Sequence, residues 1–375
     1  MFTRVLLRRI EFFILTHNQL VPGSSPGGTT NRNRNVFINK ALRFFYCLLG
    51  NILATNHIFF HSLSLLLITV NSCSKDENEL PLLREKSIFE HLATSMDYSY
   101  LTNALQKTNL DVILSGGDNY TLYAPDNRAF IGFLMRQGYN SLEEVPTDEL
   151  KQLLLNHVMV GKKRYRDFKS GYFQTAASSD VNDKPLFMYI NQVNMRVTLN
   201  GNARIVQGNV MASNGIIHAV NAIIPIPSLV TFVMADPNLY NLGMALSRKD
   251  LTVDFPSILS TKNGSAPAPF TVFAPTNMAF IELMNQRQDE GLSYMDEPIL
   301  NSTLNHHILG ETNSLSTDLS DNLILNTFGG EITANITGGA TLTDSNARVS
   351  NIIVSDIQAN NGILHIIDKV ILPFK

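Results

Sequence analysis

An internal repeat constrains the fold of this chain more than any other feature. The segment TLYAPDNRAF at Thr121–Phe130 recurs as TVFAPTNMAF at Thr271–Phe280, an offset of 150 residues. Three further blocks repeat in the same order, with offsets of 141, 149 and 147 residues. A period near 150 residues is too long for a solenoid unit and long enough for each copy to bury its own core. The sequence therefore predicts two copies of one domain.

The three further blocks locate a difference between the copies. The blocks are 101–110 with 242–251, 155–158 with 304–307, and 214–218 with 361–365. The rise in offset from 141 to 150 residues places a nine-residue insertion of copy two in 261–267, which has the composition of a loop. We expect this loop to give copy two a different ligand preference or partner contact.

Each copy alternates between helix and strand patterns, which predicts a mixed α and β domain. Ser87 begins a capping box whose partner acid follows three residues later. Pro125 or Pro275 should end the central strand, because proline fixes φ and donates no backbone hydrogen bond. Asp126 or Thr276 can then cap the next helix.

The end of each copy carries a hairpin signal. The dipeptides at 214–215 and 361–362 are both Asn-Gly. They predict type I′ turns, in which both central residues need positive φ. Apolar closing strands are expected over 216–224 and 363–372.

A leader of different character precedes the two copies. Residues 58–70 form a thirteen-residue apolar core with a basic flank upstream. A membrane-spanning helix needs about 20 apolar residues, so this core is typical of a signal peptide. The sequence VNSC at 70–73 resembles a bacterial lipobox, in which the cysteine is lipidated. We therefore expect lipid attachment at Cys73; the alternatives are a plain signal peptide and a buried apolar segment.

The stretch 1–39, upstream of the signal peptide, is unusual, and this is clearest in residues 21–30. They can be back-translated into a string that resembles the T arm of a transfer RNA gene, so translation is expected to begin downstream of Met1. Residues 23–27 match the G-x-S-x-G nucleophile motif. Because they lack a preceding strand and a following helix pattern, this match is interpreted as chance.

The predicted organisation has five segments. They are an upstream extension (1–39), a lipoprotein signal peptide (40–73), a polar tether (74–83) and two domains (84–226 and 227–375). Two prolines, at positions 225 and 227, mark the boundary between the domains. So short a linker indicates that the copies pack against each other.

Charge and cysteine content exclude several classes of protein. Residues 1–73 carry seven Lys or Arg and one acid, so the chain's formal net charge of −3 leaves −9 on the remaining 302 residues. An acidic folded part argues against nucleic-acid binding, which needs a basic surface. Both cysteines, Cys47 and Cys73, precede the folded part. This excludes a disulfide framework, a thiolate nucleophile and a cysteine zinc site after residue 73.

Histidines in the repeated blocks are candidates for chemistry. The blocks pair His157 with His306 and His218 with His365. These side chains could form a metal pair or a general base, or they could be buried with both ring nitrogens bonded to backbone. We favour the buried interpretation, because the histidines stand beside apolar runs.

Acids and tyrosines give weaker signals. Paired acids such as those at 148–149 and 289–290 stand among polar residues, which is typical of helix starts and solvated faces. Tyr98, Tyr100 and Tyr240 could form a recognition surface. The alternative, which we favour, is half-buried packing.

Three repeated blocks together resemble the fasciclin (FAS1) domain. These are a strand-ending A-P-[D/T]-N-x-A-F, a helix ending in L-N-H, and a last hairpin with N-G-x-x-H before an apolar strand. The resemblance covers about residues 84–375, and copy two is the closer match because Asn221 stands in copy one where copy two has an acid. The resemblance implies mainly structural roles for its motif residues, which are Pro125, Asn127, Phe130, His157, Gly215, His218, Pro275, Asn277, Phe280, His306, Gly362, His365 and Asp368.

The resemblance implies an α+β fold, in which each domain is a β-wedge of two sheets with helices packed along one side. FAS1 domains are mostly extracellular adhesion and matrix-binding modules, although members of a family share a function less reliably than they share a fold. The expected function is a lipid-anchored, non-catalytic adhesion or ligand-binding module, without a cofactor or metal, on a bacterial cell envelope.

The expected partners are a protein or a glycan, together with the membrane through the N-terminal lipid and with no nucleic acid. We expect the chain on the outer membrane, at the cell surface. The alternative is a structural or accessory lipoprotein of an outer-membrane complex that faces the periplasm.

Overall fold

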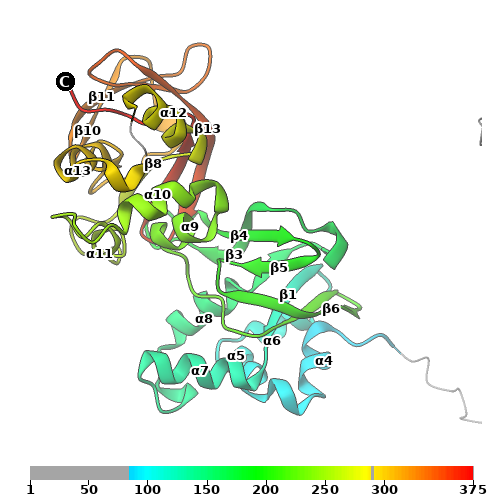
Figure 1. The fold of residues 1–375 in the computed structure, drawn as a ribbon. Coiled ribbons are helices and arrows are strands. Elements are labelled where there is room, and N and C mark those ends of the chain that lie inside the picture. The colour runs from blue at the N-terminus through cyan, green and yellow to red at the C-terminus, as the bar shows by residue number, and fades with distance from the viewer. Residues whose placement is uncertain (1–83, 289–290, 375) are drawn as a thin grey trace, which may run out of the picture. The chain divides into compact units, whose positions relative to one another are not determined.

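The computed structural model of the chain describes residues 84–288 and 291–374 (Figure 1). The predicted extension, signal peptide, lipid-attachment residue Cys73 and tether lie outside the described residues. The described part contains two copies of one α+β arrangement, which confirms the predicted fold class.

Copy one begins with helices, and its strands follow around a central pair. Its helices are α4 (Ile88–Ala93), α5 (Ser99–Lys107), α6 (Leu110–Ser115), α7 (Asn127–Gln137) and α8 (Thr147–Leu155), with 3-10 turns η1 (Met96–Tyr98), η2 (Leu142–Glu144) and η3 (Tyr165–Asp167). Its strands are β1 (Tyr120–Pro125), β2 (Val158–Val160), β3 (Gly171–Ser178), β4 (Pro185–Val193), β5 (Arg196–Leu199), β6 (Ala203–Ala212) and β7 (Gly215–Val220).

Copy two has the same order of elements. Its helices are α9 (Leu229–Ala235), α10 (Tyr240–Leu246), α11 (Phe255–Ile258), α12 (Asn277–Arg287) and α13 (Glu297–Asn305), with 3-10 turns η4 (Pro237–Leu239), η5 (Leu292–Tyr294) and η6 (Ser316–Asp318). Its strands are β8 (Phe270–Pro275), β9 (Ile308–Leu309), β10 (Leu323–Thr327), β11 (Gly330–Asn335), β12 (Thr341–Thr343), β13 (Val349–Ala359) and β14 (Gly362–Ile367).

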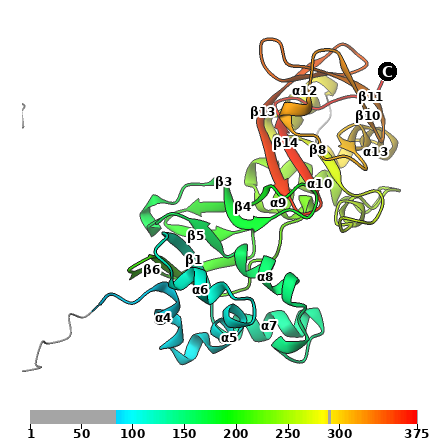
Figure 2. The same ribbon diagram turned by 180° about the vertical axis from the view of Figure 1, so that it is seen from behind.

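The strand order is the same in both copies. It is β2-β1-β7-β6-β5-β4-β3 in copy one and β9-β8-β14-β13-β12-β11-β10 in copy two. The central pairs β1–β7 and β8–β14 are parallel, and the remaining pairs are antiparallel. The long strands β6 and β13 carry irregular register, so each bends and belongs to two sheets. Figures 1 and 2 show helices on one side of the central strands in copy one.

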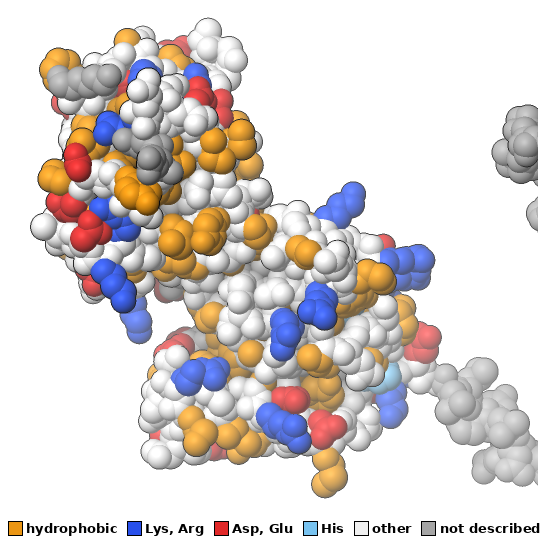
Figure 3. Space-filling model, viewed as in Figure 1, with side chains coloured by type: hydrophobic (Ala, Val, Ile, Leu, Met, Phe, Trp, Pro, Cys, Tyr) orange, Lys and Arg blue, Asp and Glu red, His pale blue; other side chains and the backbone are white. Residues whose placement is uncertain are grey.

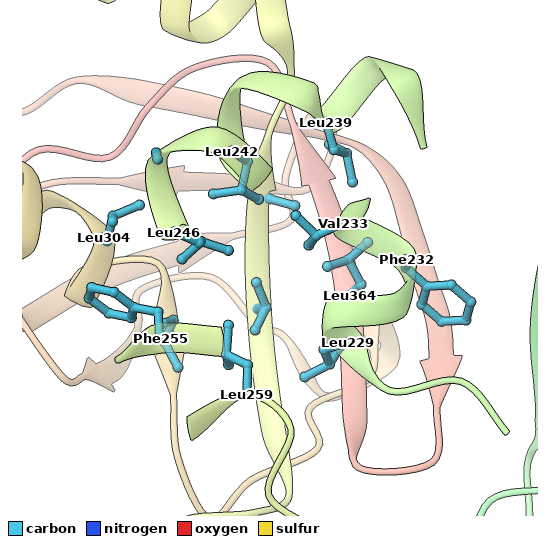
Figure 4. Close-up of a cluster of buried hydrophobic side chains, with 14 of the residues drawn as sticks. Leu229, Phe232, Val233, Leu239, Leu242, Leu246, Phe255, Leu259, Leu304 and Leu364 are labelled. Carbon is cyan, nitrogen blue, oxygen red and sulfur yellow. The ribbon is translucent and has the colours of Figure 1, made fainter. Parts of the chain in front are cut away.

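Each copy has two apolar clusters, one beneath its helices and one between its two sheets. The helix-side cluster of copy two includes Phe232, Phe255 and Leu364 (Figure 4). The inner cluster of copy two is built around Phe273, and that of copy one around Tyr123. The part of the chain that follows Leu82 forms one compact unit, and all four clusters lie among its described residues.

Helix caps explain where several elements begin. Glu90 N–H donates to Ser87 Oγ and Ser87 N–H donates to the Glu90 carboxylate, which confirms the predicted capping box. Asp126 and Thr276 accept the backbone N–H three residues later, which confirms both predicted caps. The strands before these caps end at Pro125 and Pro275, as predicted.

Strands β3 and β4 of copy one pack against copy two. The Tyr172 hydroxyl donates to Asp236 Oδ2 at 2.9 Å, and its ring meets Phe232 edge-on with 5.5 Å between centroids. Burial and the nearby carboxylate raise the Tyr172 pKa well above its usual value, so the hydroxyl remains a donor. Asn182 Nδ2 also donates to Gln358 Oε1 at 3.1 Å. The short linker therefore joins copies that pack against each other, as predicted.

Candidate functional site

The asparagine of the A-P-x-N motif joins two helices in each copy. Asn127 Oδ1 accepts the Tyr100 N–H at 3.0 Å, and its Nδ2 donates to Met96 O at 2.8 Å. Asn277 makes the same pair of contacts in copy two, with the Asn241 N–H at 2.8 Å and Pro237 O at 2.7 Å. Its side chain therefore fixes the start of α12 against the corner between η4 and α10.

We expect Asn277→Ala to lower the free energy of unfolding by about 1–3 kcal/mol, because two backbone groups lose their partner. Asn277→Asp is the matched variant, since it keeps an acceptor for Asn241 N–H and loses the donor to Pro237 O. Its loss should be smaller, and urea denaturation followed by far-UV circular dichroism measures both. Equal stability of the alanine variant and the unaltered chain would contradict this role.

The Asn-Gly dipeptides do not form the predicted type I′ turns. The two-residue loops are Ser213-Asn214 and Asn360-Asn361, and none of these residues has positive φ. Each glycine instead begins the closing strand. The prediction is wrong because tertiary contacts, rather than turn propensity, select these residues.

Each hairpin asparagine links its turn to two helical segments. Asn214 Oδ1 accepts the Ile88 N–H and its Nδ2 donates to Leu114 O, both at 2.8 Å. Asn361 Oδ1 accepts the Leu229 N–H at 3.1 Å, and its Nδ2 donates to carbonyls at the end of α11. The side chain is therefore a buried connection between the hairpin and the helical layer.

Buried histidines hold the closing segment of each copy. The His157 Nδ1–H donates to Leu153 O at 2.7 Å, and its Nε2 accepts the Ile224 N–H at 2.9 Å. His307 makes the equivalent contacts with Thr303 O at 2.7 Å and the Ile371 N–H at 3.0 Å.

The partner of His157 in copy two is therefore His307, and the predicted pairing of His157 with His306 is wrong by one residue. His306 stands where copy one has Asn156, at the end of α13, and its Nδ1 lies 2.8 Å from Ser302 O. Gly329 packs against the His306 ring, where a Cβ would lie 2.1 Å from Nδ1. His306 therefore supports the β10–β11 hairpin.

A second pair of histidines holds the bulges of the long strands. The His218 Nε2–H donates to Lys163 O at 2.9 Å, and Nδ1 faces the Asn209 N–H at 3.4 Å. His365 repeats both contacts at 2.9 and 3.4 Å, with Ser314 O and the Asp356 N–H. Asn209 and Asp356 both have a φ of 63°. His218 and His365 therefore stand at the same bulge in the two copies.

Burial decides the charge of these histidines. Desolvation lowers the pKa of His157 and of His307 to about 4, and it also lowers the pKa of His218 and His365. The rings are therefore neutral near pH 7, and their nitrogens already face backbone groups. No group of three or more His, Cys, Asp or Glu side chains within residues 84–288 and 291–374 is arranged to hold a metal ion.

The other motif residues also have structural contacts. Phe130 and Phe280 are fully buried in the helix-side clusters. Asp368 Oδ1 accepts the Asn351 N–H at 2.7 Å, and Asn221 Oδ1 accepts the Arg204 N–H at the same distance. Asn221 thus replaces the acid without loss of the contact. The closing strands end just before these residues, at Val220 and Ile367, so the predicted ranges 216–224 and 363–372 were too long.

An exposed apolar surface covers the helical corner of copy two. The α9–α12 apolar surface consists of Met234, Tyr240, Met244, Met278 and Ile281. The side chains of Tyr240 and Met278 are 62% and 69% exposed. Asn241 and Asn277, which are hydrogen-bonded, join the two helices at this surface. Figure 3 shows apolar side chains gathered where Figure 1 places α10.

Three of the five equivalent positions of copy one carry polar residues. The shared asparagine and hairpin contacts align Tyr240 with Ser99, Met244 with Asn103 and Met278 with Arg128. The fold therefore does not require an apolar residue there. Of the tyrosines considered from sequence, Tyr98 and Tyr100 pack against the core of copy one, as favoured, whereas Tyr240 is exposed.

A cleft of about 570 Å³ lies where the two copies meet. Asp148, Glu149 and Asp180 line it from copy one, and Lys262 and Asn263 line it from copy two. The last two belong to the inserted loop, which is irregular as predicted. A role of this loop in ligand preference or partner contact stays a prediction.

Comparison with known proteins identifies the repeated unit. The family model of the Fasciclin domain matches the chain twice, at residues 96–227 and 242–373. The chain belongs to the fasciclin domain family. Human periostin is 26% identical over 264 residues, which are 69% of this chain and 29% of periostin. A fasciclin-like arabinogalactan protein of Arthroderma benhamiae is 23% identical over 312 residues, which are 80% of this chain and 66% of that protein.

The chain thus spans between about a third and two thirds of the length of these relatives. A search of solved structures found a FAS1 domain pair from the insect cell adhesion molecule fasciclin I, with a TM-score of 0.44 and 18% identity. That match covers 73% of this chain and 97% of the other. No helix in the part of the chain that the structure describes combines the length and apolarity needed to cross a membrane.

One pair of residues in the two fasciclin copies was missed from sequence. Lys107 Nζ donates to three carbonyl oxygens around η2, at 2.8 to 3.0 Å. Arg248 Nη1 donates to two carbonyl oxygens around η5, at 2.6 and 2.9 Å. The repeated block 101–110 with 242–251 aligns these two cations, so their shared position was a signal for a shared structural role.

Proposed function

We propose that this fasciclin-domain protein is a non-catalytic adhesion or ligand-binding module of a cell envelope, anchored by lipid at Cys73. The α9–α12 apolar surface of copy two is the observation that carries the proposal, and we propose that it binds a protein. Met and Tyr are enriched at protein interfaces, and Met adapts to irregular partners. Ser, Asn and Arg at the equivalent positions of copy one would not bind the same partner.

The motif residues support a scaffold rather than an enzyme. A catalytic site needs polar groups that converge on a substrate and are not fully used in the fold. The polar atoms of Asn127, Asn277, His157, His307 and His365 face backbone groups. The repeated residues therefore stabilise the domain, and function is assigned to surfaces where the copies differ.

We expect the triple variant Tyr240→Ser, Met244→Asn, Met278→Arg to bind its protein partner at least about tenfold more weakly, because loss of apolar anchors at an interface costs more than about 1 kcal/mol each. Residues 84–375 would be tested on arrays of purified matrix proteins, envelope proteins and glycans. A matched control in copy one, Met96→Ser, Val112→Arg, Met135→Asn, also replaces three exposed apolar residues.

The fold should tolerate both sets of changes within about 0.5 kcal/mol. Equal binding by the triple variant and its control would overturn the assigned surface. Binding to glycans alone would overturn the choice of a protein partner. Mass spectrometry of the mature protein tests lipid at Cys73, and external protease on intact cells separates the cell surface from the periplasmic face.

A further inference from the structure

We propose that copy one docks on a membrane with anionic phospholipid headgroups. The membrane-facing surface consists of the connection between β2 and β3, the tip of the β4–β5 hairpin and the neighbouring part of β6. The proposal rests on the proposed function in one respect, the lipid anchor that would bring this surface near a membrane. Contact between the surface and lipid can be measured without the anchor.

Charge separates the two copies at this surface. The segment 162–169 of copy one carries five Lys or Arg and one acid, whereas the equivalent segment 313–320 of copy two carries no Lys or Arg and one acid. Shared contacts establish the equivalence, because His218 Nε2 faces Lys163 O and His365 Nε2 faces Ser314 O. The fold forms at both places, so it does not require the cations.

The shared acid has a structural role in both segments. The Arg164 N–H donates to Asp167 Oδ2, and the Leu315 N–H donates to Asp318 Oδ2. In contrast, the basic residues are specific to copy one. As a whole, residues 84–226 carry 14 Lys or Arg and 13 Asp or Glu, whereas residues 227–375 carry 7 and 15. An anionic membrane would therefore attract the basic segment of copy one and repel copy two.

Four of the five cations of this segment, Lys162, Arg164, Arg166 and Lys169, are exposed. Arg166 is paired with Asp167 at 3.8 Å, and both side chains are mostly exposed, so water screens this pair. Lys162 Nζ donates to Ser213 O at 3.1 Å, and Lys163 Nζ lies 5.0 Å from the centroid of the Phe173 ring. Figure 3 shows Lys and Arg side chains gathered over the part of copy one formed by β3, β4 and β5.

An apolar tip lies beside these cations. Asn194 and Met195 form the β4–β5 turn with φ of 48° and 60°, and the Met195 side chain is 78% exposed. Asn or Gly is preferred in such a turn, whereas a long side chain at positive φ is unusual. The Tyr165 hydroxyl donates to Met195 O at 2.6 Å, so the tip is fastened to the basic segment. Val193 and Val206 add further exposed apolar area.

The position where the described chain begins supports membrane lipid as the occupant. The Ser213 N–H donates to Lys86 O at 3.0 Å, and Lys162 binds the carbonyl of the same serine. The described chain therefore starts beside the basic segment. Residues 74–83 can span at most about 35 Å, so a lipid at Cys73 would hold this surface within reach of its own membrane. Cations around an exposed apolar tip suit an interface of phosphates and acyl chains, whereas a soluble polyanion would need only the cations.

Sedimentation with lipid vesicles tests this proposal on residues 84–375 without an acyl group. Vesicles of phosphatidylglycerol and phosphatidylcholine, 3:7, are compared with pure phosphatidylcholine at 0.1 M salt. We expect binding to the anionic vesicles alone. The quadruple variant Lys162→Gln, Arg164→Gln, Arg166→Gln, Lys169→Gln should bind roughly 100-fold more weakly. The variant Met195→Asn, which suits the turn, should bind about tenfold more weakly.

The matched control Arg128→Gln, Arg136→Gln, Lys151→Gln, Lys249→Gln removes four exposed cations elsewhere and should retain binding. Absence of binding to anionic vesicles, or an equal loss in the control, would overturn the proposal. Binding of inorganic polyphosphate to the same cations is a second measurement. If polyphosphate binds and Met195→Asn does not weaken that binding or the binding to vesicles, the surface would be assigned to a soluble polyanion instead. The protein used in this test carries no acyl group. A negative result would therefore say nothing about lipid attachment at Cys73 or about partner binding by copy two, which are tested separately.

Discussion

Gly215→Ala is expected to destabilise copy one by more than about 3 kcal/mol, which would unfold a marginally stable domain. A Cβ at this position would lie 2.3 Å from Tyr120 O and 2.5 Å from Ile88 Cδ1. Gly215 is paired with Tyr120 in the parallel β1–β7 ladder, and the Tyr120 N–H donates to Asn214 O at 3.0 Å. Because Tyr120 O is a backbone atom, this clash can be relieved only if the hairpin moves away from β1.

Gly117→Ala is the matched control for this change. Apart from its chain neighbours, no residue has an atom within 4 Å of a Cβ at Gly117, and the φ of Gly117 is not positive. The substitution should therefore change stability by less than about 0.5 kcal/mol. Urea denaturation followed by circular dichroism would compare the two variants. Gly362→Ala tests the same contact in copy two, where the Cβ would lie 2.3 Å from Phe270 O. Similar stability of the Gly215 and Gly117 variants would contradict the steric argument.

The sequence predicted those parts of the fold that local chemistry determines. The capping box at Ser87 and the caps at Asp126 and Thr276 depend on side chains that bond backbone groups three residues away. The repeat added a second, independent signal, since both copies place the same residue types at the same spacing. Short-range patterns and repetition were therefore sufficient for the helix starts and for the α+β class.

Residues with distant partners were harder to assign. Asn214 and Gly215 have the pattern of a tight turn, but their partners are Ile88, Leu114 and Tyr120, up to 126 residues away. Turn propensity contains no information about such contacts. Sequence reasoning therefore identified important residues at the hairpin and gave them the wrong physical role.

The histidine pairing failed for a related reason. The run L-N-H-H at 304–307 offers two histidines for one position, and sequence similarity favoured the first. The hydrogen bond to the closing segment identifies His307 as the equivalent of His157. The Nε2 of His307 accepts the Ile371 N–H, as the Nε2 of His157 accepts the Ile224 N–H. The exposed apolar surfaces could not be predicted from the sequence, because exposure depends on packing. Alignment of the two copies could nevertheless have shown that Met244 and Met278 replace polar residues.

Acidification from pH 7 to pH 5 is expected to destabilise both copies through their buried histidines. Each ring donates from Nδ1 and accepts a backbone N–H at Nε2, so a proton on Nε2 would face another donor. The pKa of His157 and His307 is about 4 in the folded chain and about 6.5 in the unfolded chain. The unfolded state therefore binds more protons in this window, and stability falls as pH falls.

The full shift corresponds to about 3 kcal/mol for each histidine, lost progressively between about pH 6.5 and pH 4. At pH 5 somewhat more than half of this loss should be present, before most carboxylates titrate. His307→Asn should be less stable at pH 7 but should lose about 2 kcal/mol less than the unaltered chain between pH 7 and pH 5. Urea denaturation at each pH measures the slope, and a stability that does not change from pH 7 to pH 5 would show that these rings gain protons without cost in the folded state.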